Sequence, residues 1–144
     1  MTRLQDIGIE VRNEPAEGLG TGVNAILYEL AGMLEALIDS GRGNAIDLRG
    51  LPLAPGEYEQ LRATLGEGEV SAEVEALGPT RIRETAIRGV WWVTHYNTHD
   101  QVLAEFLEVT EVPQLLKTER DDIREGLDLL NERLAVDFSR GQSR

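Results

Sequence analysis

The chain has 144 residues, 41% of them hydrophobic, which is enough for one globular domain with its own core. It has no cysteine, which excludes disulfides and thiolate-bound zinc or iron–sulfur clusters within the chain. Its formal net charge of −12 disfavours nucleic acid and anionic membranes as partners and would suit a basic partner surface.

The N-terminal segment, 1–20, is expected to be an irregular leader, because Pro and Gly gather in NEPAEGLGTG. GLGTG resembles a phosphate loop only in its glycines; no convincing strand precedes it and no Gly-Lys-Ser/Thr follows. The start of the chain lacks the apolar region of a signal peptide. No apolar run approaches the roughly 18 residues that a membrane span needs. These features predict a soluble cytoplasmic protein.

The first elements should be a helix, a short strand and a second helix. Residues 23–40 place leucines and other apolar side chains at helical spacing, and 46–49 alternate apolar with charged side chains, as half-buried strands do. Residues 55–65 begin with Pro55, have two glutamates near the start and stop before Gly66, which is typical of a helix.

The next stretch should form an antiparallel meander. Residues 69–76, EVSAEVEA, alternate small apolar with polar side chains, which predicts one dry and one wet sheet face. A tight return would bring Glu75 close to Arg83 on the wet face. Residues 81–97 read as one long strand, in which Gly89 is a candidate bulge.

A hairpin over 90–110 and a final helix complete the predicted elements. The helix, at 118–134, has an apolar stripe that includes Leu127 and Leu130, and the tail, 138–144, should be disordered. We therefore expect a single domain at 21–137 of the α+β class. It should have two layers, with helices packed on one face of a mostly antiparallel sheet of about four strands.

Catalytic chemistry has no clear candidate in this sequence. His95 and His99 lie four residues apart at the end of a strand, but only Asp100 could join them as a metal ligand, and two surface histidines explain the pair more simply. No Ser-His-Asp arrangement is readable, and the chain has no thiol. We expect no enzyme activity, no cofactor and no metal site.

The 90–110 hairpin contains four of the seven aromatic residues, with both tryptophans side by side. Adjacent side chains on a strand point to opposite faces, so one of Trp91 and Trp92 should enter the core. The other is either half-covered by its neighbours or exposed in an aromatic patch that binds a protein. The expected partner-binding residues are Glu73, Glu75, Trp91, Trp92, His95 and Tyr96.

Four segments carry a family resemblance: IDLRGLPL (46–53), LGEGEVSA (65–72), RETAIRGVWWVTHYN (83–97) and EFLEVTEVP (105–113). Together with the first helix, they resemble the C-terminal domain of the HupH/HyaF hydrogenase expression proteins. The resemblance implies a non-catalytic accessory chaperone for an uptake [NiFe] hydrogenase. Such a chaperone acts on the iron–sulfur small-subunit precursor before twin-arginine export, commonly beside a thioredoxin-like accessory protein.

The resemblance leaves several partners and functions open. The acidic surface would suit the basic twin-arginine signal segment of the precursor. Longer family members can contain two related copies, so a homodimer through the open sheet face or the end helices is expected. The main alternative is a generic dimeric interaction domain for another oxidoreductase or accessory complex, without catalytic activity. A third hypothesis is a small-molecule or metal-binding protein that uses His95 and His99.

Overall fold

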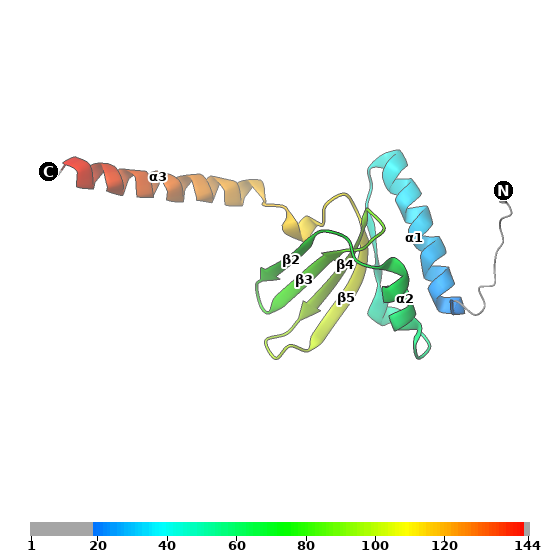
Figure 1. The fold of residues 1–144 in the computed structure, drawn as a ribbon. Coiled ribbons are helices and arrows are strands. Elements are labelled where there is room, and N and C mark those ends of the chain that lie inside the picture. The colour runs from blue at the N-terminus through cyan, green and yellow to red at the C-terminus, as the bar shows by residue number, and fades with distance from the viewer. Residues whose placement is uncertain (1–18, 143–144) are drawn as a thin grey trace. The chain divides into compact units, whose positions relative to one another are not determined.

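The computed structural model describes residues 19–142, so nearly all of the predicted leader lies outside the described residues. The chain divides into two compact units, one ending at Glu111 and one beginning at Val112, and the predicted domain at 21–137 spans both. The first unit (Figure 1) contains α1 (Thr21–Ser40), β1 (Asn44–Asp47), η3 (Leu48–Gly50), α2 (Glu57–Leu65), β2 (Ser71–Glu75), β3 (Pro79–Glu84), β4 (Val90–Tyr96) and β5 (Val102–Val109). The second contains η4 (Gln114–Leu116) and α3 (Arg120–Gln142).

The five strands form one antiparallel sheet in the order β1-β5-β4-β3-β2. This confirms the α+β class and the antiparallel sheet, with one strand more than expected. The additional strand arises because residues 81–97 are not continuous: β3 ends at Glu84 and β4 begins at Val90. Gly89 lies in the turn between them with φ 95°, a conformation that favours glycine, and the ladder irregularity lies at His95 and Tyr96 instead.

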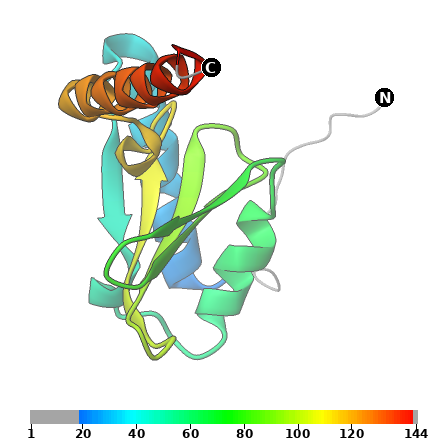
Figure 2. The ribbon, with the colours of Figure 1, turned by 90° about the vertical axis from the view of Figure 1, so that its left-hand side faces the viewer.

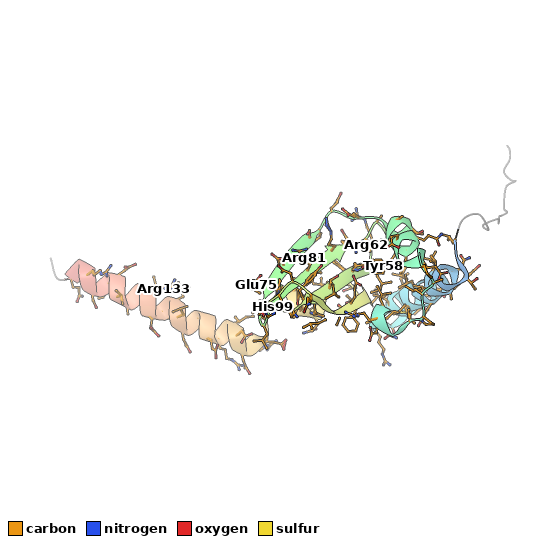
Figure 3. The ribbon with its side chains drawn as sticks, turned by 90° about the horizontal axis from the view of Figure 1, so that it is seen from below. Tyr58, Arg62, Glu75, Arg81, His99 and Arg133 are labelled. Atoms are coloured by element: carbon orange, nitrogen blue, oxygen red, sulfur yellow. The ribbon has the colours of Figure 1, made fainter. Side chains whose placement is uncertain are left out.

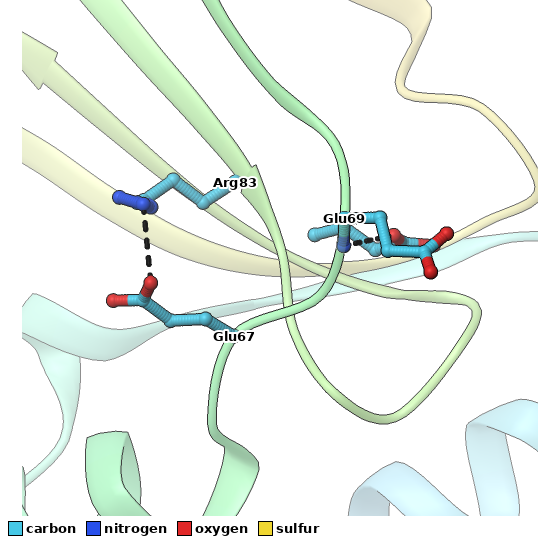
Figure 4. A network of polar contacts seen from close by, with 4 residues as sticks. Glu67, Glu69 and Arg83 are labelled. Carbon is cyan, nitrogen blue, oxygen red and sulfur yellow. Dashed lines mark hydrogen bonds and ion pairs between the residues drawn. The ribbon is translucent and has the colours of Figure 1, made fainter.

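The register of the β2–β3 hairpin differs from the expected one. Glu73, not Glu75, faces an arginine, and its carboxylate lies 3.1 Å from the Arg81 guanidinium. Arg83 reaches back to Glu67 at 3.2 Å (Figure 4). The turn around Gly78 is tighter than expected, so Glu75 pairs with Pro79 and not with Arg83, and the other residues of β2 are shifted in the same way. These ion pairs are exposed, so water and salt screen them and they contribute little to stability.

Helices α1 and α2 cover one face of the sheet, and α1 is visible behind the strands in Figure 2. The core between them has twelve buried residues: Val23, Ile26, Leu30, Met33, Ile46, Leu48, Leu61, Leu65, Val90, Trp92, Leu107 and Val109. The opposite face is not uniformly wet, because Ile82 and Val93 pair on it and are 0% and 1% exposed. The prediction of one dry and one wet face is therefore wrong at the centre of the sheet.

The N-terminus of helix α1 is bound by a carboxylate of helix α2. Glu57, at the start of α2, accepts hydrogen bonds from the backbone N–H groups of Gly22 (3.0 Å) and Ala54 (2.7 Å). A Cβ at Gly20 would lie 2.0 Å from the same carboxylate, which explains a glycine there. The glycines of GLGTG that the structure describes thus let the Glu57 carboxylate approach the N-terminus of α1, where the helix dipole favours negative charge.

No segment long and apolar enough to span a membrane was expected from the sequence, but helix α1 meets both criteria. Among the described residues, it is a helix that could cross a membrane by length and composition, with 20 residues and a mean hydropathy of 1.2. Its buried residues are Val23, Ile26, Leu30 and Met33, while the leucines Leu27, Leu34 and Leu37 of the predicted stripe pack beside them and are only partly buried.

Helix α3 runs to Gln142 and therefore includes most of the tail that was predicted to be disordered. No glycine or proline interrupts 127–140, so nothing in the sequence ends the helix near residue 137. None of its residues is buried. The side chains of Ile123, Leu127, Leu130, Leu134 and Phe138, which we call the α3 stripe, are 55–68% exposed.

Candidate functional site

The two tryptophans do point to opposite faces, but both are buried. Trp92 is 5% exposed within the helix-covered core, and Trp91 is 6% exposed on the other face. The indole N–H of Trp91 donates to the Thr110 carbonyl at 3.1 Å. The interpretation that one tryptophan is exposed in an aromatic patch is therefore wrong, because both side chains are buried.

His95 lies on the same face as Trp91 and is half-buried. Its Nδ1 lies 2.7 Å from the Thr80 hydroxyl, and its ring meets the edge of Phe106. Burial raises the pKa of the nearby Glu108 carboxyl, and His95 lowers it in part. His99 is exposed in the β4–β5 turn, and residues 19–142 contain no group of three potential ligands that could hold a metal.

The remaining predicted residues lie toward the β2 edge of the sheet. Arg81 connects two of them: its guanidinium is 5.0 Å from the centre of the Tyr96 ring and bonds to Glu73, which raises the pKa of the guanidinium. Glu75 is exposed at the end of β2. Figure 3 shows Glu75 and His99 at the end of the sheet far from Tyr58. The structure thus brings Glu73 and Tyr96 together through Arg81, and leaves both tryptophans apart from them.

A buried carboxylate that the sequence analysis did not identify lies at the centre of the helix-covered face. Glu105 on β5 is 7% exposed, and its Oε2 accepts three hydrogen bonds. The donors are the Tyr58 hydroxyl at 2.6 Å, the Trp92 indole N–H at 2.7 Å and the Thr94 hydroxyl at 3.1 Å. Strand alternation could have indicated this position, since Glu105 shares a face with Leu107 and Val109.

Helix α2 supplies the cover for this cluster. Tyr58 meets Trp92 edge to face with ring centres 5.5 Å apart, and Arg62, one turn later, lies 4.8 Å above the Trp92 ring. Tyr58 and Arg62 therefore lie together over the sheet, as Figure 3 shows. The spacing of four residues puts both side chains on one side of the helix.

A groove opens beside Glu105, with a volume of about 660 Å³. We call it the Glu105 groove. It is lined by the segment from β1 to α2 and by the start of β5: Leu48, Arg49, Leu51, Leu53, Ala54, Pro55, Gly56, Tyr58, Glu59, Val102 and Glu105. Its lining is polar and apolar in about equal measure, and the Arg49 guanidinium at its border donates to the Val102 carbonyl. The groove therefore combines leucine side chains with two carboxylates and a guanidinium.

Comparison with known proteins identifies the family. Residues 21–136 match the model of the HupH hydrogenase expression protein, C-terminal conserved region. The chain belongs to the HupH family. The solved structure of the hydrogenase expression protein HupH from Thiobacillus denitrificans ATCC 25259 is similar to this HupH-family chain with a TM-score of 0.76 and 42% identity, over 78% of this chain and 94% of that one.

Curated relatives of this HupH-family chain are longer. The hydrogenase expression/formation protein HoxQ of Azotobacter vinelandii is 35% identical over 62% of this chain and 31% of its own length. The hydrogenase expression/formation protein HupH of Rhizobium leguminosarum bv. viciae is 26% identical over 80% of this chain and 41% of its own. The chain therefore matches about a third to two fifths of the length of these relatives.

We call Glu105 and its donors Tyr58, Trp92 and Thr94 the Glu105 cluster of this HupH-family chain. The cluster changes a measurable quantity, the pKa of Tyr58. Burial, the hydrogen bond to Glu105 and the negative charge of Glu105 raise the pKa of Tyr58 to about 12, against a smaller opposing effect of Arg62. An unfolded tyrosine ionises near pH 10. The folded chain therefore holds an additional proton between about pH 10 and 12, and this group makes folding less favourable as pH rises through that window.

We expect an ultraviolet titration of the folded protein to show a tyrosine ionisation near pH 12 that Tyr58→Phe removes. Glu105→Gln should lower the pKa of Tyr58, because it removes the negative charge while burial persists. If Tyr58→Phe instead removed a tyrosine ionisation near pH 10, this would contradict the hydrogen bond between Tyr58 and Glu105.

Proposed function

We propose that this chain is a non-catalytic accessory chaperone in the maturation of an uptake [NiFe] hydrogenase. The observation that supports this is the match of 21–136 to the HupH region, together with relatives that are named hydrogenase expression/formation proteins. Its client would be the iron–sulfur small-subunit precursor, bound in the cytoplasm before export. A thioredoxin-like accessory protein is a further candidate partner.

The acidic edge of the sheet supports contact with a basic client segment. Glu73 and Glu75 are both exposed on β2, and Tyr96 packs against Arg81, the ion-pair partner of Glu73. The net charge of −12 would favour approach of a basic segment over long range. The twin-arginine signal segment of the precursor is such a segment. We therefore keep Glu73, Glu75 and Tyr96 as proposed contacts at this edge and His95 as a proposed contact on the Trp91 face, whereas Trp91 and Trp92 would act by supporting the sheet.

We expect the tagged chain to recover the small-subunit precursor from hydrogenase-expressing cells. A variant with Glu73→Gln and Glu75→Gln should recover several-fold less, because two exposed charges near the client are removed. The matched control carries Glu29→Gln and Glu35→Gln, the same charge change on exposed positions of α1, and should bind like the wild type.

The outcome distinguishes the proposed functions. Absence of the small subunit from the wild-type eluate, determined by mass spectrometry with the precursor present in the lysate, would contradict the chaperone function. Recovery of a different oxidoreductase in its place would favour the generic interaction domain. Unchanged recovery after replacing the twin arginines of the precursor would contradict the proposed contact with the signal segment.

We also propose that the chain forms a homodimer through the α3 stripe. The stripe recurs at spacings of four, three and four residues from Ile123 to Leu134, as in the seam of paired helices. The second unit buries none of it internally, and a single helix of this length is marginal in water without packing. A second copy of α3 offers the matching apolar surface.

Charge selects the antiparallel arrangement of the two helices. The first half of α3 has an excess of acid, including Asp121, Asp122, Glu125 and Asp128, whereas the second half balances its acids with Arg133 and Arg140. Parallel pairing would place the two acidic halves together. Antiparallel pairing places each acidic half against a neutral half that contains arginines, and it aligns the helix dipoles favourably.

Sedimentation should therefore give the wild type twice the 15.9 kDa mass of the chain, and Leu130→Asp should give the monomer mass. The matched control is Leu129→Asp, the same change on another side of α3, which should leave the dimer intact. A monomeric wild type, or equal effects of the two substitutions, would contradict pairing through the stripe.

A further inference from the structure

The Glu105 carboxylate has acceptor capacity that the fold does not use. All three of its hydrogen bonds in the described structure fall on Oε2, and none falls on Oε1. A carboxylate can accept about two hydrogen bonds on each oxygen. The Glu105 side chain is only 7% exposed, yet it lines the groove. Among the described residues, Oε1 thus has no hydrogen-bond donor, and the side chain to which it belongs borders the groove.

The charge of Glu105 is also without a cation of its own. None of the ion pairs among residues 19–142 includes it. The three donors on Oε2 are neutral, and Arg62 is directed to Trp92 and Tyr58. Because a charge removed from water is costly unless it is paired, a cation that enters the groove would interact strongly with this carboxylate.

The other charged groups of the groove favour the same sign of ligand. Arg49 and Glu59 line it with Glu105, so the three side chains together carry one negative charge. The Arg49 guanidinium is engaged by the Val102 carbonyl. The walls around Glu105 are Leu48, Leu51, Leu53, Ala54 and Pro55, which suit apolar stems and apolar neighbours of a basic side chain.

We propose that the Glu105 groove binds an arginine side chain from an apolar peptide segment of a partner, with the guanidinium donating to Glu105 Oε1. Arginine fits better than lysine because its guanidinium is planar, presents several donors and is weakly hydrated. This assignment deepens the proposed function and rests on it for the partner, but the binding chemistry can be tested without any hydrogenase component.

The two tryptophans provide the readout in the full chain labelled with ¹⁵N. The Trp92 indole N–H donates to the same carboxylate, whereas the Trp91 indole N–H donates to Thr110 on the other face. The probe is an acetylated and amidated peptide, Leu-Ala-Arg-Leu-Ala, and the control peptide replaces its arginine with citrulline, which has a similar shape without the charge.

We expect the arginine peptide to shift the Trp92 indole signal to saturation and to leave the Trp91 signal in place. It should bind about tenfold or more tightly than the citrulline peptide, since a hydrogen bond between charged partners is lost in the control. In Glu105→Gln, the two peptides should bind equally. Glu59→Gln, which removes a charge at the groove border, should retain most of the preference for arginine.

Equal affinity of the wild type for the two peptides would overturn the proposal, even if Glu105→Gln fails to fold. A shift confined to Trp91, or an unchanged arginine preference in folded Glu105→Gln, would overturn it as well. Peptide binding with the expected preference, combined with failure to recover the small subunit, would support the groove and contradict the hydrogenase client. The reverse combination would contradict the groove alone.

Discussion

The three hydrogen bonds to Glu105 Oε2 are the interaction on which the first unit depends. They join a helix to two strands, because Tyr58 comes from α2, Trp92 and Thr94 come from β4, and Glu105 comes from β5. The cluster fixes the position of α2 over the sheet and fixes Trp92 in the core. A carboxylate at this depth is tolerated only because its donors are in place. The fold and the groove beside it thus depend on the same side chain.

A binding protein gains from a groove whose polar group is held in advance. Glu105 is oriented by its three donors, so a ligand does not have to order it. The exposed acids of β2 lie elsewhere on the sheet and act over longer range. In the proposed functions the two features would act in succession: the acidic edge would attract a basic segment, and the groove would hold one of its side chains. The α3 stripe is a separate surface, and its proposed partner is another copy of the chain.

The fold was largely predictable from the sequence, whereas of the site only the buried position of Glu105 could have been indicated, through strand alternation. Alternation in 69–76 and the apolar stripe of α1 indicated their elements, but the turn before β4 has only Gly89 as a signal, so two strands were read as one. Glu105 and Glu108 lie three residues apart on β5 and face opposite sides of the sheet. Residue type alone does not distinguish them. The burial of both tryptophans depends on what covers each face, which local patterns do not contain.

The most direct test of this account is the free energy of unfolding of Glu105→Leu, measured by chemical denaturation. We expect a loss of at least about 3 kcal/mol, because the buried donors of Trp92 and Thr94 and the Tyr58 hydroxyl lose their acceptor. Glu73→Leu, at an exposed position of β2, should change the stability by no more than about 1 kcal/mol. A Glu105→Leu variant as stable as the wild type would contradict the central place given to this carboxylate.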